Sequence, residues 1–180
     1  PINDSQSMGG AEKAVQEIQG QVRTWISFIE NKLGCTISGK SPIIAWLIEH
    51  AGTLLNRTKV GDDGKTAYMR IKGKKSKTRM VPFGEKVLWM IPKEERKKGP
   101  KMKPRFHYGT WVGINEVTGE YTMMTPIGIK RSRTVRRIPI ADRWDEEFLK
   151  RCIGVPWDHT GQEIDEDMRE TMEIPEPNAN

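Results

Sequence analysis

The side chains best suited to chemistry lie on one face of a predicted helix near the start of the chain. Glu12, Gln16, Gln19 and Arg23 follow one another at spacings of four, three and four residues, which places them on one side of an α-helix. A carboxylate there could hold a divalent cation, while the amides and the guanidinium could contact phosphate groups. A glutamate in a first helical turn can also simply complement the helix dipole. Taken alone, the spacing favours this second explanation.

A second chemical feature is a dense basic segment in the middle of the chain. Between Arg70 and Arg105 there are 14 Lys and Arg against three Glu, a net charge of +11, whereas the whole chain carries +6. Such a segment implies a polyanionic partner, with a solvated surface or a flexible linker as the alternative. We expect nucleic acid rather than a membrane, because no amphipathic helix accompanies the charge. Besides Gln16, Gln19 and Arg23, the predicted DNA-contacting residues are Lys74, Lys75, Lys77, Arg79, Lys97, Lys98, Arg131, Arg133 and Arg136.

Helices followed by short strands must position these side chains. Apolar residues recur at helical spacing over 9–33, before Gly34, and a second, almost uniformly apolar helix begins at Ser41-Pro42. A short helical segment is predicted over 66–73, and a last helix around 145–152. Between them, aromatic and β-branched segments bounded by Gly, Pro and Asn predict strands at 85–92, 107–115, 120–126 and 129–139.

The predicted strands differ in character. The segment 130–137 is basic on both faces, so we expect an edge strand or a strand that faces DNA. Trp89, Tyr108, Trp111 and Tyr121 are predicted to fill the core of a small sheet or barrel rather than to stack on bases.

Three blocks of the sequence resemble, in the same order, the integrases of copia-type retrotransposons. The first block, DSQSMGGAEKAVQ, places Glu12 on the family's last catalytic glutamate, Gly9 on the motif glycine and Lys13 on the usual arginine. The second, AWLIEHAGTLLNRTKVGDDGKTAYMRIKGKK, has Ala67 where proline is common. The third combines FGEKVLWMIP with KMKPRFHYGTWVGIN. The resemblance covers residues 1–139 and departs from the motif at Met8, where the family has asparagine.

The resemblance implies an α+β chain with a specific organisation. Residues 1–73 would be the terminal helices of a ribonuclease-H-like catalytic core, and 74–139 a small basic antiparallel β-barrel similar to Src-homology-3 domains. Glu12 would be a catalytic residue and a ligand of Mg²⁺ or Mn²⁺ in polynucleotidyl transfer. The family's two other catalytic carboxylates lie further upstream than the 11 residues that precede Glu12, so we expect this chain to be inactive alone.

The remaining expectations concern the end of the chain and its surroundings. Residues 140–159 are predicted to form a C-terminal helix, and 160–180 an acidic disordered tail with a net charge of -6. The expected partner is duplex DNA, both element ends and target, with no membrane and with self-association in the full-length protein. Two distant cysteines indicate a reducing, intracellular setting, nuclear and cytoplasmic. The alternatives are a non-catalytic nucleic-acid or chromatin-binding adaptor, or a degenerate retroelement remnant.

Overall fold

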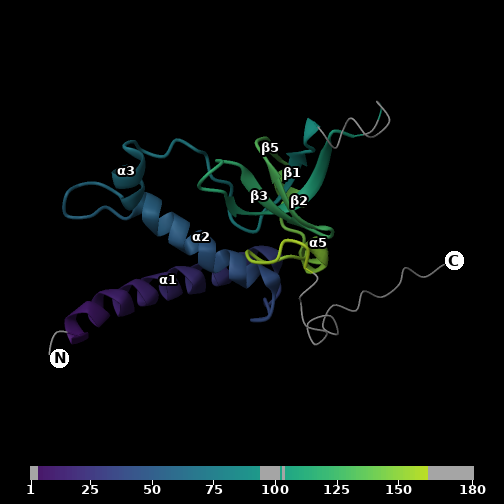
Figure 1. Cartoon of the computed structure of the whole chain (residues 1–180). Helices are drawn as coiled ribbons and strands as arrows, with labels where there is room; N and C mark the ends of the chain where they lie inside the picture. Colours follow the sequence, from purple (N-terminus) through teal and green to yellow (C-terminus); the bar gives the residue numbers. More distant parts are fainter. Residues whose placement is uncertain (1–3, 94–101, 103, 162–180) are drawn as a thin grey trace.

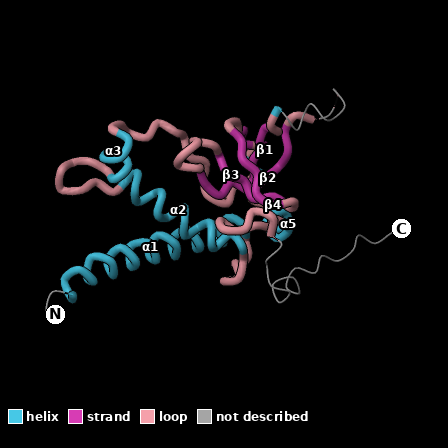
Figure 2. Tube along the Cα trace, in the orientation of Figure 1, coloured by secondary structure: helices cyan, strands magenta, loops and turns pink. Residues whose placement is uncertain are grey.

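The computed structural model describes residues 4–93, 102 and 104–161, and it confirms the predicted α+β class. Helices α1 (Asp4–Leu33), α2 (Pro42–Thr58) and α3 (Ala67–Lys72) come first. Figure 1 shows them beside the sheet, and Figure 2 shows the same separation of helices and strands. The later elements are β1 (Lys86–Met90), β2 (Phe106–Ile114), β3 (Tyr121–Thr125), β4 (Gly128–Ser132), β5 (Val135–Arg137), the short 3₁₀ turn η1 (Ile140–Asp142) and α5 (Glu146–Arg151).

The helix boundaries follow the sequence signals closely. Helix α1 begins at Asp4, five residues earlier than predicted, and ends at Leu33, just before Gly34, whose φ of 74° suits a residue without a side chain. Ser41 precedes α2, and Pro42 occupies its first turn, where a missing N–H costs nothing. The hydroxyl of Thr66 accepts a hydrogen bond from the Met69 N–H and so caps α3.

The five strands form one antiparallel sheet in the order β4-β3-β2-β1-β5. The single strand predicted over 129–139 is wrong, because the chain turns at Arg133 and Thr134 and divides it into β4 and β5. The Ser132 hydroxyl accepts from the Thr134 N–H and donates to the Met90 carbonyl at 2.9 Å, which stabilises the turn. Both pieces lie at sheet edges, as predicted. Since only two residues join the opposite edges, the sheet must curl strongly.

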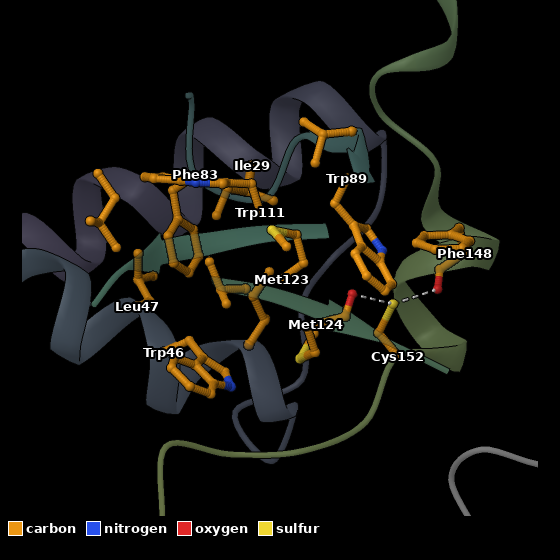
Figure 3. Close-up of a cluster of buried hydrophobic side chains, with 14 residues drawn as sticks. Ile29, Trp46, Leu47, Phe83, Trp89, Trp111, Met123, Met124, Phe148 and Cys152 are labelled. Atoms are coloured by element: carbon orange, nitrogen blue, oxygen red, sulfur yellow. Dashed lines mark hydrogen bonds between the residues drawn. The ribbon is translucent and has the colours of Figure 1, made fainter. Parts of the chain in front are cut away.

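One hydrophobic core joins the helices to the sheet. Ile29 of α1, Leu47 of α2 and Trp111 of β2 are all 0% exposed and belong to the same buried cluster. Figure 3 shows them around Phe83 and Met123. The cluster therefore crosses the boundary predicted at Gly73, and burial of its large side chains stabilises the helices and the strands together.

The predicted aromatic core is confirmed only in part. Trp89 and Trp111 are buried, and Tyr121 is partly buried, but Tyr108 is 51% exposed. The strand register gives the reason: Tyr108 lies opposite Leu88, and residues one position apart on a strand point to opposite faces. Tyr108 therefore lies on the outer face of the sheet while Trp89 points inward.

The segment after α5 fastens the sheet to α2. The Trp46 indole N–H donates to the Gly154 carbonyl at 2.9 Å, and the Ile129 N–H donates to the His159 carbonyl at 2.8 Å. Gly128 allows this approach, because a Cβ added there would lie 2.5 Å from the His159 oxygen. None of the described helices combines the length and apolar character that a membrane span requires.

Candidate nucleic-acid interface

The polar face predicted on α1 is present at the surface. Glu12, Gln16, Gln19 and Arg23 are all exposed on this one helix. Nearby, Glu17 pairs with Lys59, which ties α1 to the end of α2. Within the part of the chain that the structure describes, no three His, Cys, Asp or Glu side chains are grouped to hold a metal ion. The resemblance assigns Glu12 as one of three metal ligands, and this assignment stays a prediction about a complete enzyme.

The basic segment after α3 lies open to solvent. Lys74, Lys75, Lys77 and Arg79 are exposed, and Gly73, with a φ of 68°, turns the chain out of α3 just before them. The Tyr121 hydroxyl donates to the Arg79 carbonyl at 3.2 Å and so anchors the segment to the start of β3. Among the described residues, no carboxylate lies within ion-pair distance of these four cations. Their charge is available to an external anion.

This anchor links the basic segment to the strand pair that carries two further arginines. Tyr121 pairs with Ser132 across β3 and β4, and Ser132 lies between Arg131 and Arg133. The Arg79 carbonyl therefore lies at the Tyr121 hydroxyl, on the strand face that Ser132 shares, whereas the Arg131 side chain alternates to the other face of β4. Arg131 is exposed, and the side chain of Arg133 is 83% exposed with only a 3.5 Å approach to Glu120. We call Lys74, Lys75, Lys77, Arg79, Arg131 and Arg133 the basic face.

Arg136 lies on β5, outside this group. It pairs in register with Leu88 and is exposed, and its guanidinium lies 4.8 Å from the centroid of the Phe106 ring. The aromatic contact orients the side chain without neutralising its charge. The Arg136 side chain is thus exposed. No described hydrogen bond or ion pair links it to the polar face on α1.

The sequence analysis missed a buried acid that organises the same strands. The side chain of Glu85 is 1% exposed and accepts hydrogen bonds at 2.6 and 2.7 Å from Arg137, with Arg143 at 3.5 Å. The hydrogen bond from Arg137 to Glu85 raises the pKa of Arg137. The sequence feature that could have indicated this buried acid is a single glutamate directly before an apolar strand, within a basic segment. The main role of Arg137 is therefore to stabilise the fold through Glu85 rather than to bind a ligand.

A second missed residue, Arg57, joins α2 to the β2–β3 hairpin. Its side chain is 7% exposed, pairs with Glu116 at 3.0 Å and lies over the Tyr68 ring at 5.3 Å. Next to it, burial and then the charge of Arg57 lower the pKa of His50 to about 4. His50 is 3% exposed between Trp25, Phe83 and Trp111, in agreement with a structural role.

Three predicted features lie outside the described residues. They are Lys97, Lys98 and the acidic tail from residue 162 onward. No protein-family model, curated protein or solved structure matches the chain.

Proposed function

We propose that the chain binds duplex DNA through the basic face and serves in DNA integration as part of a copia-type retrotransposon integrase. One observation carries the proposal: two basic segments distant in the sequence, 74–79 and 131–133, carry exposed cations without a strong carboxylate partner among the described residues, and Tyr121 contacts the first segment and pairs with the second. Lys and Arg in such an arrangement contact phosphates, and their binding releases counterions from DNA. On this proposal, α1 to α3 are the last helices of a ribonuclease-H-like core. The curled sheet is then the small barrel of the Src-homology-3 type.

The chain would contribute little base recognition of its own. Its cations lie on an extended segment and at sheet edges, whereas base reading commonly uses a helix or a two-stranded ribbon in the major groove. We therefore expect binding with little sequence preference. In the complete enzyme, Glu12 would join two further carboxylates in holding Mg²⁺ or Mn²⁺, which would activate the phosphoryl transfer.

A charge-matched pair of variants tests the DNA-binding part. In the first variant Lys74, Lys75 and Lys77 are changed to glutamine. In the second, three exposed lysines outside the basic face are changed in the same way, namely Lys32, Lys40 and Lys65. Both lose the same net charge, so a general electrostatic effect acts on both. We expect the first to weaken duplex binding by about tenfold or more and to lower the magnitude of the salt slope by about 3, with a much smaller effect in the second. Equal losses in the two variants would refute the assignment to this face.

A further inference from the structure

A groove beside β1 and β2 has the opposite charge character to the basic face. Its volume is about 790 Å³, and it lies between the outer face of β1 and β2 and the segment that carries η1 and the start of α5. Apolar lining comes from Leu88, Tyr108, Pro139 and Trp144. The charged residues that line the groove are four carboxylates and two cations, although the net charge of the whole chain is +6.

The two cations of the groove are already neutralised. Lys86 donates to Asp145 at 2.6 Å, and Arg137 pairs with Glu85 at 2.6 Å. Burial alone would raise the pKa of Asp145, but hydrogen bonds from Lys86 and from the Phe148 N–H lower it overall, so this carboxyl is ionised at neutral pH. Both cations that line the groove are thus already paired with carboxylates.

Two acids of the groove keep their negative charge available. Asp142 is exposed and has no ion-pair partner among the described residues. The side chain of Glu147 is 81% exposed and only approaches Lys150 to 3.7 Å, a cation that Glu146 binds more closely at 2.8 Å. A cationic ligand could therefore reach Asp142 without breaking a described pair, and Glu147 by displacing only its 3.7 Å approach to Lys150.

The aromatic part of the groove already holds a cation. The Lys86 ammonium lies 4.9 Å from the ring centroids of both Tyr108 and Phe148. Tyr108 nevertheless remains 51% exposed, so it offers further ring surface. A planar guanidinium can stack on such a ring while its N–H groups bind carboxylates, which an ammonium group does less well.

We propose that this groove binds an extended, arginine-bearing peptide segment of a partner protein. The guanidinium would pack against Tyr108 and donate hydrogen bonds to Asp142 and Glu147, while neighbouring apolar residues would contact Leu88, Pro139 and Trp144. The acidic rim disfavours a nucleic acid, and a single free arginine would leave most of the groove empty. This interaction is independent of the proposed DNA binding, because the two use different residues and opposite charges.

The experiment uses the full chain and a fluorescein-labelled peptide that repeats proline, alanine and arginine. Its matched control replaces every arginine with glutamine. Fluorescence anisotropy should give saturable binding of the arginine peptide with a Kd of about 1–100 μM and binding of the glutamine peptide at least about tenfold weaker. Absence of saturable binding, or equal binding of the two peptides, would overturn the proposal.

Variants then locate the site. Changing Asp142→Asn together with Glu147→Gln should weaken peptide binding by about tenfold, and Tyr108→Leu should weaken it by about fivefold. The matched control, Glu49→Gln with Asp62→Asn, removes the same charge from two exposed acids elsewhere and should leave peptide binding within about twofold. Duplex binding should not weaken in the Asp142/Glu147 variant. Equal loss of peptide binding in the control, or loss of duplex binding in the groove variant, would contradict the assignment.

Discussion

Breaking the pair between Glu85 and Arg137 should destabilise the protein by an amount that depends on which partner is removed. Glu85 is the buried member, with a side chain that is 1% exposed, whereas Arg137 is 46% exposed and Arg143 is 20% exposed. Loss of one partner from a buried pair typically costs about 3–5 kcal/mol, because the remaining charge is left without compensation. Here the two remaining charges would have very different access to water.

The two substitutions are therefore expected to differ. In Glu85→Gln the unpaired groups are arginines that reach solvent, and glutamine keeps the shape and one acceptor, so we expect a loss of about 2 kcal/mol. In Arg137→Met the unpaired group is a carboxylate that solvent does not reach, with only Arg143 left at 3.5 Å. We expect that loss to be about 4 kcal/mol. At about 2–4 °C for each kcal/mol in a chain of this size, the falls in Tm would be about 4–8 °C and about 8–16 °C.

Urea unfolding followed by tryptophan fluorescence measures these free energies, with thermal unfolding as a second readout. The control is Arg136→Met, one residue away on β5, which removes an exposed cation that lies over Phe106. It should cost less than about 1 kcal/mol. If Glu85→Gln cost more than Arg137→Met, or if Arg136→Met and Arg137→Met cost the same, the argument from burial would be refuted.

Three further predictions follow from the same structure. Burial and then the charge of Arg57 lower the pKa of His50 from 6.5 to about 4, so the neutral form stabilises the fold above pH 6.5 and this contribution is lost as pH falls toward 4. The free energy of unfolding should fall by about 3 kcal/mol over this range. Urea unfolding at several pH values measures the fall, which a His50→Leu variant should lack. Identical pH dependence in both proteins would contradict the prediction. Deleting 162–180, which carries a net charge of -6, should tighten duplex binding at low ionic strength, whereas an unchanged affinity would argue against competition by the tail. In an integrase that also supplies the two upstream carboxylates, Glu12→Gln should abolish strand transfer with Mg²⁺ or Mn²⁺ and leave duplex binding intact; retained activity would show that Glu12 is not the catalytic glutamate.

Local sequence signals predicted most of the elements but not their assembly. The helices were recognisable because their apolar spacing and their ends, such as Gly34 and Ser41-Pro42, depend on neighbouring residues alone. The break between β4 and β5 was missed because Arg133-Thr134 contains no Gly, Pro or Asn. The exposure of Tyr108 depends on its register with Leu88, which its own strand does not encode.

For the candidate site, too, the sequence predicted the local features but not the long-range contacts. Charge density predicted that Lys74 and Arg131 would be exposed, because unpaired cations are rarely buried. The link between their two segments depends on the contact between Tyr121 and Arg79, which are 42 residues apart. The pair between Glu85 and Arg137 spans 52 residues and was likewise inaccessible to local patterns.

The salt dependence of duplex binding tests the proposed function most directly. Anisotropy of a short labelled duplex, titrated with the full chain between about 50 and about 200 mM salt, gives the slope of log affinity against log salt. If the six cations of the basic face contact phosphates, each contributes about 0.9, and a slope of about -5 is expected. A slope near zero, or no binding at low salt, would contradict the assignment of this chain as a DNA-binding protein.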